Sequence, residues 1–133
     1  MAAAVTNPQA RLEALSDDFQ KLQQDLQETV ASRQRLEGQR QENIGVQKEF
    51  ENLGDDETIY KLTGPVLLKQ DKMEANSTVK GRLDFINGEI TRLEGVIRSS
   101  QQSMEKKKAE IIQIQAAAQA AGAGAGAGVD GPQ

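Results

Sequence analysis

Apolar residues recur at alternating steps of three and four along the first part of the chain, which is the heptad pattern of a coiled-coil helix. The positions are Leu12, Leu15, Phe19, Leu22 and Leu26. Continued strictly, the pattern next meets polar side chains, at Thr29, Arg33 and Arg40. A shifted phase fits the following residues better, namely Leu36, Gln39, Asn43, Val46, Phe50 and Leu53. We therefore expect two phases joined by consecutive three-residue steps, where the supercoil is locally overwound.

The ends of this first helix are marked by residues that favour helix boundaries. Asn7 suits the N-cap and Pro8 the first helical position, where no amide donor is needed. Gly54 suits the left-handed conformation that commonly ends a helix. The sequence thus predicts a flexible segment over residues 1–7 and a helix over 8–54.

A longer heptad pattern fills the second half of the chain. Nine of its eleven positions are apolar: Val79, Leu83, Ile86, Ile90, Leu93, Ile97, Ser100, Met104, Lys107, Ile111 and Ile114. This periodicity predicts a second helix. Asp71 and Glu74 have the spacing of a capping box, so the helix is expected over 71–117. The Ala- and Gly-rich residues 118–133 have almost nothing to bury and are predicted to be disordered.

Between the two helices, residues 57–70 have the pattern of a β-hairpin. Two short runs of apolar residues flank a Gly-Pro break, which is typical of two strands and a turn. The residues concerned are Ile59, Tyr60, Leu62, Gly64, Pro65, Val66, Leu67 and Leu68. Side chains alternate between the faces of a strand, so both faces of this ribbon are apolar. An isolated hairpin is marginally stable in water, and we infer that other chains complete this one.

Helices of similar length on either side of a hairpin must turn back on each other. The predicted fold is therefore mostly α, a long antiparallel two-helix coiled coil with one β-hairpin at the helix–helix connection. About forty residues per helix at ~1.5 Å each give a coil roughly 60 Å long. Both chain termini are expected at its far tip. The periodicity does not fix the pairing register.

Composition narrows the possible functions. The 133 residues contain no His and no Cys and carry a net charge of −4. The usual proton shuttle, the commonest metal ligand and all thiol chemistry are thus missing, so we expect no enzyme activity, metal or cofactor. The acidic balance disfavours nucleic acid as a partner. No run is long and apolar enough for a membrane span, and no signal peptide is evident, which predicts a cytoplasmic protein.

The apolar residues nearest the chain termini permit two interpretations. They are Leu12, Leu15, Phe19, Ile111 and Ile114. In one interpretation they are ordinary coiled-coil packing. In the other they are partly exposed, because Ile112 adjoins Ile111 and both cannot point into one narrow seam. Partly exposed apolar residues at a mobile tip suit low-specificity binding to unfolded chains.

The hairpin and second helix carry a resemblance to a known family. The two segments read Tyr60-Lys-Leu-Thr-Gly-Pro-Val-Leu-Leu-Lys-Gln-Asp71 and Arg82-Leu-Asp-Phe-Ile-Asn-Gly-Glu-Ile-Thr-Arg-Leu-Glu94. Together with the heptads before and after them, over residues 9–115, they resemble a β-type subunit of eukaryotic prefoldin. A β-type subunit has one hairpin, as here.

The resemblance implies a function and partners. Prefoldin is an ATP-independent co-chaperone hexamer of α-type and β-type subunits, whose hairpins form an intersubunit β-barrel. Its tips hold unfolded clients such as actin and tubulin and pass them to the cytosolic group II chaperonin. By position, residues 57–70 would be the assembly strands, and the five apolar residues near the termini would contact client or chaperonin. The alternative is a coiled-coil scaffold or tether that oligomerises through its hairpin.

Overall fold

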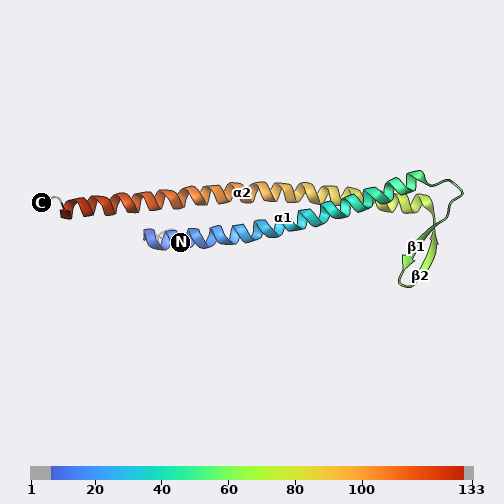
Figure 1. Ribbon diagram of the computed structural model, residues 1–133, viewed down its shortest axis with the longest axis horizontal. Helices are drawn as coiled ribbons and strands as arrows, with labels where there is room; N and C mark the ends of the chain where they lie inside the picture. The colour runs from blue at the N-terminus through green and yellow to red at the C-terminus, as the bar shows by residue number, and fades with distance from the viewer. Residues whose placement is uncertain (1–6, 131–133) are drawn as a thin grey trace. The chain divides into compact units, whose positions relative to one another are not determined.

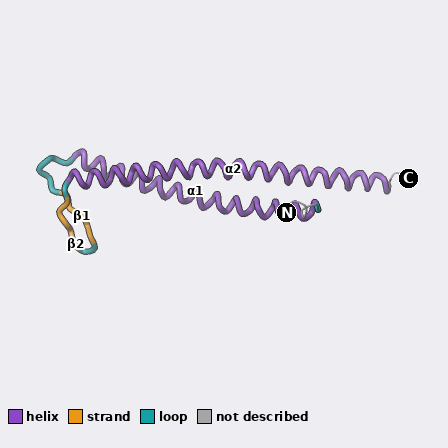
Figure 2. The backbone as a smooth tube through the Cα atoms, turned by 180° about the vertical axis from the view of Figure 1, so that it is seen from behind, coloured by secondary structure: helices purple, strands orange, loops and turns teal. Residues whose placement is uncertain are grey.

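The computed structural model describes the backbone of residues 7–130 and the side chains of residues 7–122. Two long helices flank one hairpin (Figures 1 and 2). Helix α1 spans Pro8–Asn52, strand β1 Ile59–Thr63, strand β2 Val66–Gln70 and helix α2 Lys72–Asp130. The predicted fold class, two coiled-coil helices with a hairpin at their connection, is confirmed. Most of the predicted flexible N-terminus, residues 1–6, lies outside the described residues.

The start of α1 follows the predicted cap, whereas its end does not. The Asn7 Oδ1 atom accepts a hydrogen bond from the Gln9 amide at 3.0 Å, and Pro8 is the first helical residue. Gly54 does not adopt the left-handed conformation, since Gly64 is the positive-φ glycine of the described chain. Instead, the Lys72 Nζ atom donates to the Leu53 carbonyl at 2.9 Å. A cation at the base of α2 therefore satisfies a carbonyl at the end of α1, in place of the expected glycine cap.

Helix α2 begins as expected but extends beyond its predicted end. The Asp71 Oδ2 atom accepts a hydrogen bond from the Glu74 amide at 3.3 Å, which is half of the predicted capping box. The helix continues to Asp130, whereas the sequence predicted its end at residue 117 and disorder from 118. No proline interrupts residues 118–130, so their backbone amides can all join the helix. Alanine favours the helix there, whereas each alternating glycine disfavours it by about 1 kcal/mol relative to alanine. Residues 131–133 lie outside the described part of the chain.

The hairpin closes through a two-residue turn. Ile59 pairs with Gln70 at its base and Thr63 with Val66 at its tip, so Gly64 and Pro65 form the turn. Gly64 has φ of 61°. Proline fixes its own φ near −65°, which excludes a turn with two positive-φ residues and leaves the type II′ geometry, with glycine first. A side chain at position 64 would be strained.

Two compact units make up the chain, and each is described by itself. The hairpin unit comprises residues 30–95, and the terminal unit comprises residues 1–29 and 96–133. In the hairpin unit the two helices run antiparallel, with Arg33 beside Glu94 and Arg40 beside Asn87. The buried residues among those described all belong to α2 in this unit: Ala75, Val79, Leu83, Ile86, Ile90 and Leu93.

The seam of α1 is the row of heptad positions on the side that faces α2. The heptad phase of this seam does not change along the helix. The predicted shift of phase is wrong, because Gln39 and Val46 are exposed whereas Arg40 and Gln47 are half-buried. The strict heptad therefore continues through the polar positions to Phe50. Arginine is tolerated at a seam position because its aliphatic stem covers apolar surface while its guanidinium group reaches a polar partner.

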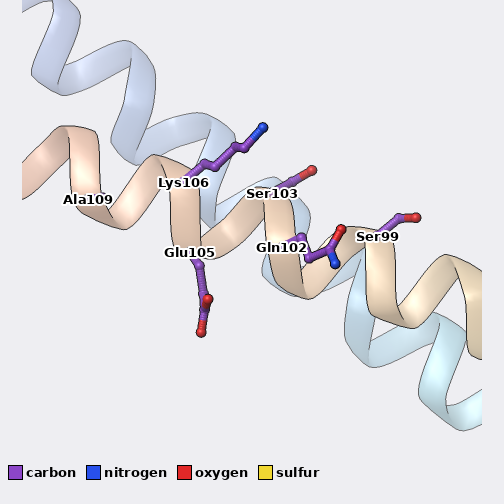
Figure 3. Close-up of a pocket in the computed structure, with 6 residues that line it drawn as sticks. All are labelled: Ser99, Gln102, Ser103, Glu105, Lys106 and Ala109. Atoms are coloured by element: carbon purple, nitrogen blue, oxygen red, sulfur yellow. The ribbon is translucent and has the colours of Figure 1, made fainter.

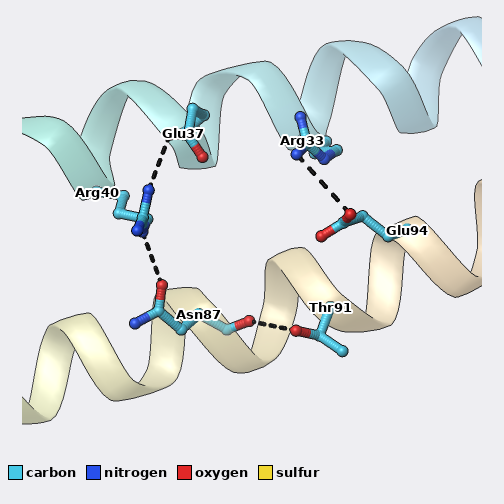
Figure 4. Close-up of polar contacts among 6 residues, drawn as sticks. All are labelled: Arg33, Glu37, Arg40, Asn87, Thr91 and Glu94. Atoms are coloured by element: carbon cyan, nitrogen blue, oxygen red, sulfur yellow. Dashed lines mark hydrogen bonds and ion pairs between the residues drawn. The ribbon is translucent and has the colours of Figure 1, made fainter.

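Polar contacts occupy this part of the seam and define the register that the sequence left open (Figure 4). The Arg40 Nε atom donates to Asn87 Oδ1 at 2.9 Å, and its Nη1 atom lies 3.0 Å from Glu37 Oε1. Arg33 Nη2 lies 3.9 Å from Glu94 Oε2. Hydrogen bonding from Gln41, with Arg40 beside it, lowers the pKa of Glu37 below its usual value. Such exposed contacts add little stability, but a polar residue in a coiled-coil seam restricts its register.

Candidate functional site

The hairpin presents apolar side chains that nothing in the described chain covers. The pairing places Tyr60, Leu62 and Leu67 on one face. Ile59, Val66 and Leu68 lie on the other. Leu62 is 69 % exposed, Leu67 63 % and Tyr60 57 %. The hairpin thus brings the residues predicted for assembly together and exposes apolar side chains on both of its faces. Exposed apolar surface of this kind often marks a site of interaction with another protein.

The terminal unit has no buried residue among those whose side chains are described. Five seam residues here are the predicted tip residues, and all are half-buried: Leu12, Leu15, Phe19, Ile111 and Ile114. Lys107, on the same seam, pairs with Asp18 at 3.5 Å. Ile112, just off the seam, is 54 % exposed. These residues therefore occupy ordinary seam positions and yet keep part of their apolar surface in contact with water.

Two open hollows lie between the helices of the terminal unit. One, of about 370 Å³, is lined by Pro8, Gln9, Leu12, Ile114, Gln115, Ala118 and Gln119. The other, of about 340 Å³, is lined by Phe19, Leu26, Gln101, Met104, Glu105 and Lys108. Leu26 and Met104 were predicted as seam residues but not as site residues. They were not predicted as site residues because they lie far from the chain termini in sequence. The polar seam residues next to them, Ser100 and Thr29, could have indicated that the helices pack loosely there.

A further hollow, of about 530 Å³, lies on the outer surface of α2 alone (Figure 3). It is lined by Ser99, Gln102, Ser103, Glu105, Lys106 and Ala109. One helix cannot surround a substrate, and Lys106 and Glu105 point in different directions in Figure 3. This surface therefore lacks the convergent side chains that acid–base chemistry needs.

Neither a metal cluster nor a membrane-spanning helix emerges from the described residues. No group of three or more carboxylates among them is arranged to hold a metal ion. None of the helices they form is long and apolar enough to cross a bilayer. The chemistry that these surfaces offer is apolar contact and main-chain pairing.

Comparison with known proteins decides the family. The profile of the prefoldin subunit family matches residues 13–118. The chain belongs to the prefoldin family. Prefoldin subunit 6 of Saccharomyces cerevisiae is 46 % identical over 100 residues, which are 75 % of this chain and 88 % of the yeast protein. The subunit 6 of Homo sapiens is 40 % identical over 107 residues, 80 % of this chain and 83 % of the human protein.

Solved structures agree with this assignment. The crystal structure of the prefoldin beta subunit from Thermococcus strain KS-1 superposes with a TM-score of 0.73 at 25 % identity. The match covers 85 % of this chain and 96 % of the archaeal one. The resemblance to a eukaryotic β-type subunit is confirmed, and with it the assignment of the chain as a prefoldin chaperone subunit.

Proposed function

We propose that the chain is one subunit of a hexameric, ATP-independent co-chaperone that binds unfolded polypeptides in the cytoplasm. Actin and tubulin are the expected clients, and the cytosolic group II chaperonin is the expected recipient. Other prefoldin subunits, of α-type and β-type, are the partners in the assembly. The observation that carries the proposal is the uncovered apolar ribbon of residues 59–70 together with the half-buried tip residues.

The exposed apolar side chains and unpaired strand edges of the hairpin favour assembly with other subunits. Each exposed leucine or valine gains about 1.5–3 kcal/mol when it is fully buried. A two-stranded sheet also leaves the outer edges of β1 and β2 without partner strands. Strands from neighbouring subunits would cover the faces and pair with both edges, closing an intersubunit β-barrel.

The tip residues suit a weak and adaptable grip. A seam that is half-buried can bind a client without first breaking a tight core. Weak contacts from several arms on one client give avidity through high effective concentration, and each contact can still open for release. Holding exposed apolar segments in this way lowers the concentration of free unfolded chain and so suppresses aggregation.

We expect that serine at four tip positions abolishes most of this protection. The variant carries Leu15→Ser, Phe19→Ser, Ile111→Ser and Ile114→Ser. Each change removes about 1 kcal/mol of client contact, since the side chains are half-buried, and together they should weaken capture by roughly two to three orders of magnitude. The measurement is light scattering by denatured actin diluted into the assembled complex, with assembly checked by native mass spectrometry.

A matched control places serine at four exposed positions of the same helices, with Gln20→Ser, Gln24→Ser, Gln102→Ser and Gln113→Ser. This variant should protect the client as the wild-type complex does. Undiminished protection by the tip variant would remove the tips as the grip. No protection even by the wild-type complex would favour the alternative, a coiled-coil scaffold that shares the hairpin assembly.

A further inference from the structure

The two hollows of the terminal unit lie along one side of the helix pair. Gln101 and Lys108 line the hollow at Phe19, and Gln115 lines the hollow at Leu12. These three residues of α2 are spaced seven apart, so they share one face of the helix. The two hollows therefore lie on the same side of the helix pair, and we call them together the amide groove. Its floor is apolar: Leu12, Phe19, Leu26, Met104 and Ile114.

The rim of the amide groove is made chiefly of neutral amides. Four glutamines line it, Gln9, Gln101, Gln115 and Gln119, together with Glu105 and Lys108, whose charges are opposite. The rim therefore has no net charge.

A row of charged residues that line neither hollow follows another face of α1. Arg11, Asp18 and Asp25 are spaced seven apart along α1 and so share a face. Asp18 forms the ion pair with Lys107 there. The terminal unit thus combines a charged face of α1 with two hollows that have an apolar floor and a rim made chiefly of amides.

We propose that the amide groove holds the client as an extended segment, with apolar side chains on the floor and the main chain hydrogen-bonded to the glutamine rim. This inference rests on the proposed function and specifies where and how the client is bound. An unfolded segment pressed against apolar surface loses water from its peptide groups, and each group left without a hydrogen-bond partner weakens binding. A glutamine side chain offers both a donor and an acceptor, so it can satisfy a peptide N–H or C=O.

The groove dimensions and chemistry agree with such a ligand. From Pro8 to Leu26 the helix rises about 27 Å, at ~1.5 Å per residue. An extended chain covers that length with about eight residues, at ~3.3 Å each. Because the glutamines would hydrogen-bond to the main chain of the client and not to its side chains, the groove would accept many sequences. A rim without net charge would repel clients of neither sign.

The test replaces two rim amides by isosteric carboxylates, Gln101→Glu and Gln115→Glu. Glutamate keeps the size and helix propensity of glutamine but loses its donors. We expect the assembled complex to need at least ~5-fold more protein to suppress aggregation of denatured firefly luciferase. The matched control, Gln102→Glu with Gln113→Glu, adds the same charge to exposed positions of α2 outside the groove and should leave protection unchanged.

A second rim variant separates hydrogen bonding from apolar area. With Gln101→Leu and Gln115→Leu, a grip that depended on apolar area alone would tighten. The proposal predicts weaker protection, because client peptide groups would lose their partners. A photo-crosslinking residue at position 101 of the otherwise wild-type complex should capture luciferase, whereas one at position 102 should not. Equal capture at the two positions would overturn the proposal, whether or not the rim variants assemble.

The outcomes also distinguish this inference from the function on which it rests. Normal protection by both rim variants, with the four-serine tip variant impaired, overturns the amide groove and leaves the proposed function standing. Equal loss in the rim and control glutamate variants would assign the effect to charge and also overturn the groove. Normal protection by the rim and tip variants alike would remove both the groove and the tips as the grip, whereas no protection even by the wild-type complex would contradict the proposed function itself.

Discussion

We expect that Leu62→Thr with Leu67→Thr prevents the chain from joining the prefoldin complex. These two residues pair across the strands and stand on one face of the hairpin, largely exposed. Threonine keeps the strand propensity but removes most of the apolar surface that neighbouring strands would cover. Loss of two buried leucines costs about 3–6 kcal/mol, which weakens association by roughly two to four orders of magnitude. Native mass spectrometry of subunits mixed at low micromolar concentration measures the loss.

The same hairpin provides a matched control. Lys61→Thr with Lys69→Thr introduces the same residue into the same two strands and leaves every apolar side chain in place. This variant should assemble at wild-type concentrations. Assembly of the leucine variant at wild-type strength would show that the exposed apolar face takes no part in subunit contact.

The second large effect concerns the buried part of the coil. Ile90→Ala removes a side chain that is 6 % exposed in the hairpin unit. Deleting a buried isoleucine to alanine costs about 2–5 kcal/mol, because the lost transfer free energy adds to that of the cavity left behind. We expect the thermal midpoint of the assembled complex to fall by several degrees, measured by helix circular dichroism at fixed protein concentration.

Ile112→Ala is the control, since it makes the same change on the same helix at a largely exposed position. It should leave the midpoint within about one degree, because little apolar burial is lost and alanine favours the helix. Equal destabilisation by the two variants would contradict the difference in packing between the hairpin unit and the terminal unit.

The sequence predicted the architecture because each element has a strong local signal. The eleven seam positions of α2 are all buried or half-buried, as their periodicity indicated. Gly64-Pro65 marked the turn because few other pairs fit a positive φ followed by a fixed negative one. Asn7 and Asp71 marked helix starts through hydrogen bonds to amides two and three residues later.

Where prediction failed, a contact distant in sequence decided the outcome. A polar residue at a heptad position, such as Arg40, predicts the end of that heptad phase. Its partner Asn87 lies 47 residues away and makes the seam position acceptable. The predicted cap at the end of α1 was wrong for the same reason, because Lys72 of α2 donates the hydrogen bond that was expected from the glycine cap. The amide groove was missed because its rim and floor come from both helices, and periodicity did not reveal their register.

Amide hydrogen exchange at single-residue resolution in the assembled complex tests most directly whether other chains complete the hairpin. In a two-stranded antiparallel ribbon, alternate amides point away from the partner strand and exchange freely. Our account predicts that all the amide groups of β1 and β2 are protected, including those at the outer edges. Free exchange at every second residue of Ile59–Thr63 and Val66–Gln70 would mean that no neighbouring strand pairs with the hairpin, and would contradict the account.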